Sequence, residues 1–319
     1  MRFQGIFVPI IIVILVLVFI LPIPEGILDL LHGVNIMISA IILLNTIYIK
    51  DAEEISIFPT LLVITTIFRL SVNVATTKLI LADGSAGKVV DGFGNFVARG
   101  NMVVGFVVFI IIVIVNFLVI TKGAERIAEV AARFTLDAMP GKQMAIDADL
   151  NSGMIDENEA RERRKKVQKS ADFYGAMDGA TKFVKNDAIA GILIGLINIV
   201  GGLITGMLMR GESFQEALQT YALLTIGDGL VCQIPALMIS TATSFVVTRS
   251  ASDTEISQEL LGQLFRNHIV MYIAAFVSFV LSFFLAKIPF WLLTALFTYI
   301  GYSLSKQQKQ EAVTEEEEQ

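Results

Sequence analysis

Residues 102–120 read MVVGFVVFIIIVIVNFLVI and carry no charged side chain. About 20 consecutive apolar residues in an α-helix are enough to cross the hydrocarbon core of a bilayer. The whole chain has the same character, because 55% of its residues are hydrophobic and only 17% are charged. Ordinary soluble domains have roughly 25% charged residues. The sequence therefore predicts an all-α, polytopic membrane protein.

Seven other apolar runs have a similar length, so we expect about eight transmembrane helices. The eight expected spans, including the run quoted above, are Ile6–Ile23, Ile27–Ile49, Ser56–Leu79, Met102–Ile120, Ala188–Met209, Tyr221–Val247, Ile269–Ala286 and Ile288–Leu304. The last two runs are joined only by Lys287-Ile288-Pro289, which indicates a tight hairpin or a partly re-entrant element. We expect transmembrane helices 1–4 in residues 1–121 and helices 5–8 in residues 188–304.

A polar block, residues 122–187, separates these two halves, and we expect it to form a small helical cytoplasmic insert. Lys122–Ala132 continues the fourth span as a helix, and Met139-Pro140-Gly141 predicts a turn that breaks it. Gln143–Asp149 is expected to form a further short helix, which Asn151-Ser152-Gly153 ends. Asp156, with Glu159 three residues later, resembles a capping box. It predicts the start of a charged helix, followed by a second helical stretch over Phe173–Lys185.

The distribution of lysine and arginine predicts the orientation in the membrane. With the polar block in the cytoplasm, an eight-span chain has both termini there, and most of its 24 lysine and arginine residues lie on that side. Only Lys88, Arg99, Arg210 and Lys287 lie on the other side. Residues 305–319 are acidic, and their composition predicts a solvated, disordered linker.

The chain lacks the motifs of common enzymes, and we expect no catalytic activity, metal centre or cofactor. It has no P-loop, no HExxH and no nucleophile elbow. Its one cysteine and two histidines exclude an internal disulfide and disfavour a histidine metal site. Asp147, Asp149 and Asn151 have the spacing that opens an EF-hand loop, but the glycine and the final glutamate each fall one place late. A helix end followed by an N-cap is the better interpretation.

Three charged residues stand inside or at the ends of apolar runs. Arg69 lies within the third span, where a charge costs about 2.5–3.5 kcal/mol and must face protein, water or a partner. Asp228, between two glycines, is the only carboxylate well inside a span. A carboxyl group in a low-dielectric environment favours its neutral form, which suits reversible proton binding. Asp187 ends the polar block, where the chain re-enters the membrane, and its spacing alone indicates an N-cap for the fifth span. A structural ion pair for Arg69 and an interfacial position for Asp228 remain open.

Small and amide side chains predict contacts between helices. Gly191, Gly195, Gly202 and Gly206 have the four-residue spacing that allows close helix approach in the fifth span. Asparagines within spans are candidates for hydrogen bonds between helices; these are Asn35, Asn45, Asn73, Asn116 and Asn198.

Several stretches together resemble the FHIPEP family, the export-gate proteins of flagellar and type III secretion systems, and we expect the flagellar branch. The longest is RFTLDAMPGKQMAIDADLNSG, residues 133–153. The others are Phe68–Ala75, Lys122–Val130, Asp178–Val184, Asn186–Gly191 and Gly227–Pro235.

The resemblance implies an inner-membrane protein that forms a nine-membered ring and couples the proton motive force to translocation of unfolded flagellar subunits. Protons, or sodium ions, are the implied coupling ions. The implied partners are FlhB and a core of the FliP, FliQ and FliR type. Because members of the family continue into a large cytoplasmic domain, residues 305–319 resemble the linker towards a missing C-terminal domain. An ATPase complex and chaperone–substrate complexes are implied as partners chiefly through that domain. The residues implied in ion or energy coupling are Arg69, Arg126, Arg133, Asp137, Lys182, Asp187 and Asp228.

These observations lead to one mechanistic hypothesis and two rivals. The hypothesis pairs Asp228 with Arg69 in the membrane and lets Asp187, Lys182 and Arg126 relay the state of that pair to the polar block. One rival is an ion-coupled transporter of a small solute, although the first half has no counterpart to Gly227-Asp228-Gly229. The other rival is a purely structural ring.

Overall fold

The computed structural model describes residues 4–98, 100–249, 262–284 and 287–317. Every regular element within these ranges is helical, which confirms the expected all-α class. The chain falls into two compact units, one up to residue 251 and one from residue 252. Each unit is described by itself below.

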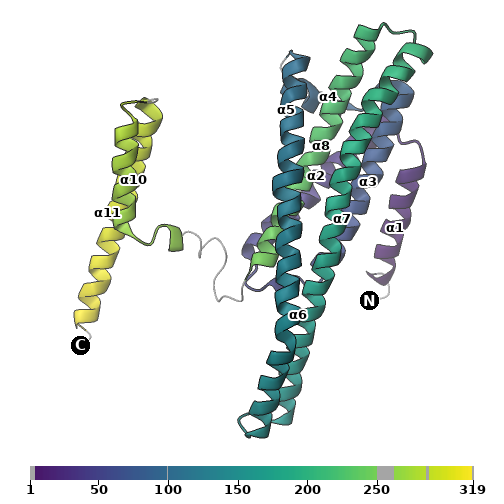
Figure 1. Ribbon diagram of the computed structural model, residues 1–319. Helices are drawn as coiled ribbons and strands as arrows, with labels where there is room; N and C mark the ends of the chain where they lie inside the picture. The colour runs from purple at the N-terminus through teal and green to yellow at the C-terminus, as the bar shows by residue number, and fades with distance from the viewer. Residues whose placement is uncertain (1–3, 99, 250–261, 285–286, 318–319) are drawn as a thin grey trace. The chain divides into compact units, whose positions relative to one another are not determined.

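The first unit contains ten helical elements in the described residues (Figure 1). They are α1 (Gln4–Ile20), α2 (Glu25–Tyr48), the 3-10 helix η1 (Ala52–Ile55), α3 (Phe58–Asp83), α4 (Lys88–Ala98), α5 (Met102–Val115), the π-helical segment η2 (Asn116–Thr121), α6 (Lys122–Asn151), α7 (Glu157–Met209) and α8 (Phe214–Thr248). The second unit contains α10 (His268–Leu281) and α11 (Lys287–Glu317), which pack against each other as the expected hairpin.

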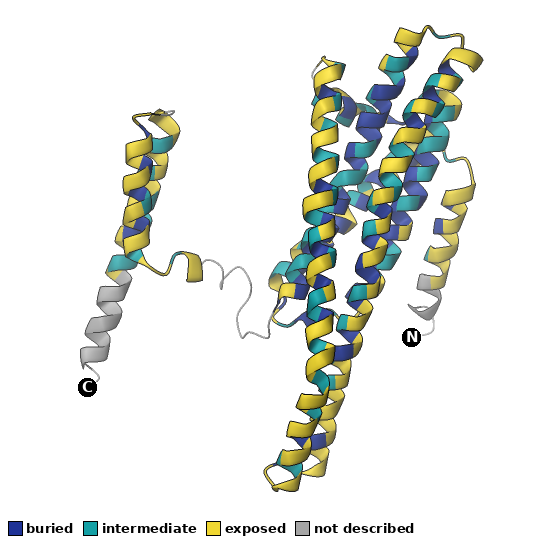
Figure 2. Ribbon diagram, viewed as in Figure 1, coloured by how far each residue is buried: buried dark blue, intermediate teal, exposed yellow. Residues whose placement is uncertain are grey.

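Six helices of the described residues are long and apolar enough to span a membrane. The first and seventh expected spans correspond to shorter apolar helices, Pro9–Ile20 and His268–Leu281, so the count of eight is approximate. Side chains on the outward faces of α5 and α7 are exposed (Figure 2), and many of them are isoleucine, valine or leucine. Exposed apolar surface on this scale is typical of contact with lipid. The chain is therefore a multi-pass membrane protein.

The polar block forms a two-helix hairpin made of α6 and the first half of α7, which extends past the other helices of the first unit (Figure 1). Gly153, with φ of 75°, lies in the turn between them, and the Asp156 side chain accepts a hydrogen bond from the Glu159 amide. The predicted helix end and N-cap are thus confirmed. Small side chains such as Ala128 and Ala132 are buried along the hairpin and let the two helices approach closely.

Two predicted interruptions of the hairpin are wrong. Pro140 lies inside α6, so the helix does not break at 139–141. The residue is exposed, so water can satisfy the carbonyl group that loses its backbone donor. Contacts with α7 on both sides of this point hold the helix together. The charged helix and the stretch over Phe173–Lys185 are likewise one continuous helix, α7.

The acidic tail also differs from its prediction, because α11 continues as helix through Glu317. Glutamine, lysine, alanine and glutamate are all good helix formers. They extend the apolar helix beyond its membrane-length part. The predicted disordered linker is therefore helical up to residue 317, and residues 318–319 lie outside the described residues.

A core of buried side chains ties the hairpin to the membrane helices. Leu62 of α3 and Met177 of α7 are fully buried, and Val246 of α8 lies in the same cluster as Ala128 of α6. The α7 residues of this cluster lie between Phe173 and Val184, so the core holds the part of α7 directly before the point where it enters the apolar region. This arrangement positions Asp187, which lies at that point.

At two glycines of α7, the helix packs directly against the ring of Tyr221 in α8. A Cβ atom at Gly202 would overlap the ring of Tyr221, which is fully buried. We therefore expect Gly202→Ala to lower the free energy of unfolding by about 1–3 kcal/mol through overpacking. Gly191→Ala is the matched control, because no neighbouring atom lies within 4 Å of a Cβ there. Chemical denaturation in detergent measures both variants, and equal stability would contradict the observed packing.

Short-range polar contacts fix α4, which is not among the membrane-length helices. The carboxylate of Asp29 in α2 accepts hydrogen bonds from the amides of Lys88 and Val89 at the start of α4, at 3.1 and 2.9 Å. Burial, followed by the nearby carboxylates of Glu25 and Asp29, raises the pKa of Asp91 in the same helix. The folded state therefore disfavours the ionised form of Asp91.

This shift predicts a pH-dependent effect of Asp91→Asn. An aspartate whose folded pKa lies above its unfolded value costs stability when ionised, and the cost disappears as the pH falls through the folded pKa. The variant should therefore melt at a higher temperature than the wild type at neutral pH, and the difference should shrink in acid. Thermal unfolding in detergent across a pH series tests this, and a pH-independent difference would contradict it.

Candidate ion-coupling site

The guanidinium of Arg69 forms an ion pair with the carboxylate of Asp187, which joins α3 to α7. The two side chains are only 4% and 3% exposed. A buried ion pair must hold both charges together, because removing one partner leaves an uncompensated charge in a low-dielectric environment. Asp187 is therefore the counter-ion of Arg69. It lies inside α7, whose N-cap is Asp156, so the interpretation of Asp187 as an N-cap is wrong.

This pairing corrects the hypothesis that Arg69 pairs with Asp228. Asp228 lies on α8, where its carboxylate accepts a hydrogen bond of 3.1 Å from the amide of Asn198 in α7. Among the described residues, Asp228 forms no ion pair, although it is only 3% exposed. The two acidic residues thus differ: Asp187 has a buried cation beside it, and Asp228 has only neutral hydrogen-bond donors.

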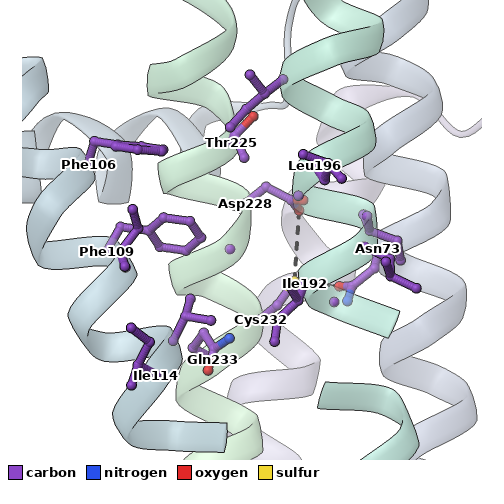
Figure 3. Close-up of a pocket in the computed structure, with 18 residues that line it drawn as sticks. Asn73, Phe106, Phe109, Ile114, Ile192, Leu196, Thr225, Asp228, Cys232 and Gln233 are labelled. Carbon is purple, nitrogen blue, oxygen red and sulfur yellow. Dashed lines mark hydrogen bonds between the residues drawn. The ribbon is translucent and has the colours of Figure 1, made fainter. Parts of the chain in front are cut away.

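Asp228 lies at the wall of a cavity of about 430 Å³ between α5, α7 and α8 (Figure 3). Most of the lining is apolar, with Phe106 and Phe109 on α5 and Ile192 and Leu196 on α7. The polar lining residues are Asn73, Thr225, Asp228, Cys232 and Gln233. A single carboxylate in an apolar wall can exchange a proton with few competing groups, which suits a proton-binding site.

Five asparagines were candidates for hydrogen bonds between helices, and the side chains of three of them form such bonds around this cavity. Asn198 bonds to Asp228, Asn116 of η2 donates to Gln233 of α8, and the thiol of Cys232 donates to Asn73 of α3. The same thiol lies 3.8 Å from a carboxylate oxygen of Asp228. Because η2 is π-helical, Asn116 lies in a wider helical turn of the kind often found at functional sites.

The four glycines of α7 divide between two roles. Gly202 and Gly206 contact the ring of Tyr221 closely, so they provide the helix approach that their spacing predicts. Gly191 and Gly195 line the cavity, and a Cβ at Gly195 would make only ordinary contact with Thr225. The second pair therefore leaves space beside Asp228.

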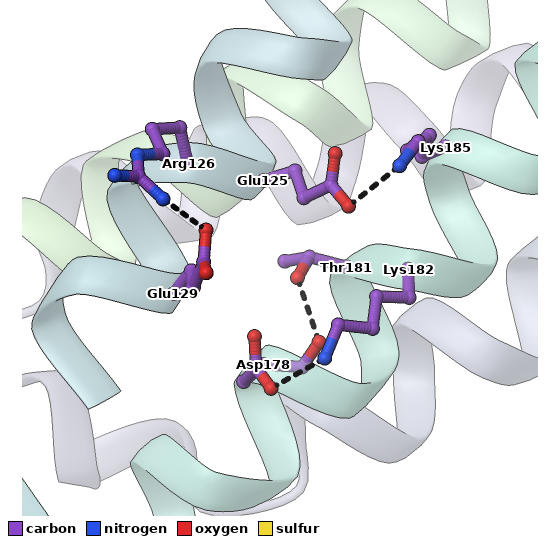
Figure 4. A network of polar contacts seen from close by, with 7 residues as sticks. All are labelled: Glu125, Arg126, Glu129, Asp178, Thr181, Lys182 and Lys185. Atoms are coloured by element: carbon purple, nitrogen blue, oxygen red, sulfur yellow. Dashed lines mark hydrogen bonds and ion pairs between the residues drawn. The ribbon is translucent and has the colours of Figure 1, made fainter. Parts of the chain in front are cut away.

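Lys182 and Arg126, which were expected to relay the state of the intramembrane pair together with Asp187, form ion pairs within their own helices and not with Asp187. Lys182 pairs with Asp178 at 2.8 Å on α7, and Arg126 pairs with Glu129 at 2.6 Å on α6 (Figure 4). Near these residues, α6 and α7 are joined by the ion pair Lys185–Glu125, at 3.0 Å. Its two side chains are 33% and 15% exposed. Sequence reasoning missed this pair, because only the packing of α6 on α7 brings these distant residues together.

The remaining charged candidates lie on exposed surface of the hairpin. Arg133 and Asp137 are 3.8 Å apart and their side chains are 82% and 71% exposed. Such a pair contributes little to stability, so both groups are free to meet another molecule. Asp147 and Asp149, considered above for calcium, pair with Arg164 and Arg163 at 2.5 and 3.2 Å and join the two hairpin helices.

Cys232 is a site residue that the sequence analysis did not single out. It follows Asp228 by four residues, and this spacing places two side chains on the same face of a helix. The four-residue spacing could therefore have identified Cys232 as a neighbour of Asp228. The sequence gives no sign of its contact with Asn73, which depends on the packing of α3 against α8.

Comparison with known proteins places these features in a family. A flagellar biosynthesis protein FlhA of Bacillus subtilis (strain 168) is 53% identical over 310 residues, which cover 96% of this chain and 45% of that protein. The FlhA of Salmonella typhimurium is 56% identical over 274 residues, covering 84% of this chain and 40% of that protein. A putative flagellar export/assembly protein LfhA of Escherichia coli O44:H18 is 50% identical over 306 residues, covering 94% and 44%.

The chain thus spans less than half the length of these curated relatives. No solved structure matches it. The family model described as FHIPEP matches residues 14–319, a range that contains every candidate residue of the site. The chain therefore belongs to the FHIPEP family.

Proposed function

We propose that this chain is the membrane part of a flagellar export-apparatus component that couples the proton motive force to translocation of unfolded flagellar subunits. Family membership and the names of the relatives support the flagellar export role. The observation that carries the coupling proposal is the buried Arg69–Asp187 pair. It lies where α7 passes from the polar hairpin into the apolar region.

The proposed mechanism begins at Asp228, which takes up and releases a proton at the cavity wall. Asn198, the hydrogen-bond donor to Asp228, lies on α7 together with Asp187. A change of charge at Asp228 therefore acts on the same continuous helix that carries the buried ion pair. Because α7 also forms one half of the hairpin, a small shift of this helix reaches the charged surface of the hairpin without a separate linker.

The exposed charges of the hairpin then act on partners of the apparatus. Four of these charged side chains lie on accessible surface: Arg126, Arg133, Asp137 and Lys182. In this proposal they transmit the helix shift to neighbouring molecules. The proposed partners are further copies of this chain in a ring, FlhB and the FliP, FliQ and FliR type core. In the whole protein, the ATPase complex and chaperone–substrate complexes join chiefly through a C-terminal cytoplasmic domain.

We propose a location in the inner membrane with both termini and the hairpin in the cytoplasm, since the hairpin carries the densest cluster of lysine and arginine. The mechanism needs only protons, or sodium ions, as coupling ions, and assigns the chain no enzymatic step and no cofactor.

A hybrid protein tests the proposed function. The matching membrane part of the Bacillus subtilis relative is replaced by this chain in a strain that lacks its own copy. We expect the hybrid to restore secretion of flagellar subunits and swimming. A hybrid that inserts into the membrane but restores no secretion would contradict the proposal. Solute uptake by the purified chain in liposomes would favour a small-solute transporter instead.

A further inference from the structure

Cys232 stands between two hydrogen-bond acceptors of different charge. Its sulfur contacts the side-chain oxygen of Asn73 on α3 and lies 3.8 Å from a carboxylate oxygen of Asp228 on its own helix. A thiol has a single proton, so it donates fully to only one acceptor at a time. Figure 3 shows the three side chains together at the cavity wall.

The choice between these acceptors depends on the charge of Asp228. An ionised carboxylate is a stronger acceptor than a neutral amide oxygen, so it attracts the thiol proton. Once Asp228 has taken up a proton, it loses this advantage, and the amide oxygen of Asn73 becomes the better acceptor. Cys232 is only half-buried and lines the cavity, so the thiol has room to turn.

Asn73 lies one helical turn from Arg69 on α3. Arg69 in turn holds Asp187 of α7. The polar contacts therefore run from Asp228 through Cys232 and Asn73 to the helix segment that carries the buried ion pair. Asn198 provides a second connection, from Asp228 to α7.

We propose that Cys232 is a positioning residue whose thiol proton moves between Asp228 and Asn73, so that α3 responds to the charge of Asp228. This rests on the proposed function, in which Asp228 takes up and releases a proton. Cys232 itself binds no ion and forms no covalent bond in the process. Its role is to donate its thiol hydrogen bond either to Asp228 or to Asn73.

Other titratable groups belong to the helices around this region. Arg69 and Asp187 pair with each other across α3 and α7. His32 of α2 lies 3.0 Å from the hydroxyl of Thr76 in α3, and Asp91 belongs to α4, which packs against α8. The residues of α5 carry no charge. A pH titration must therefore separate Asp228 from these groups, which the variants below do.

Infrared spectroscopy of the purified chain in lipid is the direct test, because the sequence has one cysteine and hence one S–H stretching band. We expect this band to move to lower frequency as the carboxylic acid band of Asp228 disappears with rising pH. The acid band is assigned by its loss in Asp228→Asn, where the S–H band should not move with pH. In Asn73→Leu the S–H band should change at low pH, when Asp228 is protonated.

The two possible failures are distinguishable. If the acid band of Asp228 titrates while the S–H band stays fixed, the role of Cys232 is refuted and the proposed function stands. If the acid band does not titrate at all, Asp228 exchanges no proton and both proposals fail.

Flux measurements provide an independent readout. Cys232→Ser keeps a hydrogen-bond donor, so proton flux in liposomes should stay close to that of the wild type. Cys232→Ala removes the donor and should lower flux about tenfold, the order expected for losing one hydrogen bond to a charged group. Thr225→Val, which changes a hydroxyl in the same cavity that donates within its own helix, is the control. Wild-type flux in folded Cys232→Ala would overturn the proposal.

Discussion

Asp187→Ala is expected to lower the free energy of unfolding of the purified chain by about 3–5 kcal/mol. The reason is the Arg69 side chain, which is 4% exposed and has Asp187 as its ion-pair partner. With the carboxylate gone, the guanidinium stays charged in an apolar environment. Denaturation in detergent, followed by circular dichroism, measures the loss.

The matched control is Arg164→Gln. It breaks the pair of Arg164 with Asp147, whose side chains are 48% and 52% exposed. An exposed pair contributes about 0.2–1 kcal/mol, so the two variants should differ severalfold in their effect. If Asp187→Ala were as mild as this control, the buried pair would not be the structural anchor described above.

A double replacement separates the structural role of the pair from its role in coupling. Arg69→Met combined with Asp187→Leu removes both charges, and apolar residues of similar volume can replace a buried pair with little loss of stability. We expect the double variant to recover most of the stability that Asp187→Ala loses, while export in the hybrid strain stays absent. Recovery of export would assign the pair to structure alone and favour the scaffold interpretation.

Asp228→Asn is expected to abolish export in the hybrid strain while the protein remains folded and inserted. Asparagine has nearly the same size and keeps an oxygen that can accept the hydrogen bond from Asn198. It cannot take up or release a proton. Secretion of flagellar subunits into the medium is the measurement, with the amount of protein in the membrane quantified alongside.

Thr225→Val tests whether any polar change in the cavity has the same effect. Thr225 lines the cavity one turn before Asp228, and its hydroxyl donates to the carbonyl of Tyr221 in the same helix. Because this bond lies within α8, we expect export close to that of the unchanged hybrid. Normal export by Asp228→Asn would remove the carboxylate from the mechanism.

The pattern of apolar runs predicted the membrane helices well because hydrophobicity is a local property. The run over 102–120 became α5 and η2, and the turn at Gly153 and the cap at Asp156 were also readable from neighbouring residues. Pro140 shows where local reasoning fails, since packing between α6 and α7 overrides the tendency of proline to end a helix. The prediction of a disordered tail from its composition was also wrong, since α11 extends through residues with high helix propensity.

The partners of the buried charges were not predictable in the same way. The sequence shows that Arg69 needs an acidic partner, and both Asp187 and Asp228 were available. Which of them faces Arg69 depends on how α7 and α8 rotate against α3. Gly202 of α7 and Tyr221 of α8 form one of the close contacts between these two helices. The same packing brings Cys232 to Asn73, a contact with no signature in the sequence.

Proton flux in liposomes tests the central claim most directly. Liposomes contain the purified wild-type chain, Asp187→Ala or Asp228→Asn, and a pH-sensitive dye inside reports proton entry after a membrane potential is applied. The account predicts flux with the wild type and none above empty liposomes with either variant. Equal flux from the wild type and Asp228→Asn, or no flux from a wild-type protein shown to be folded and assembled, would contradict it.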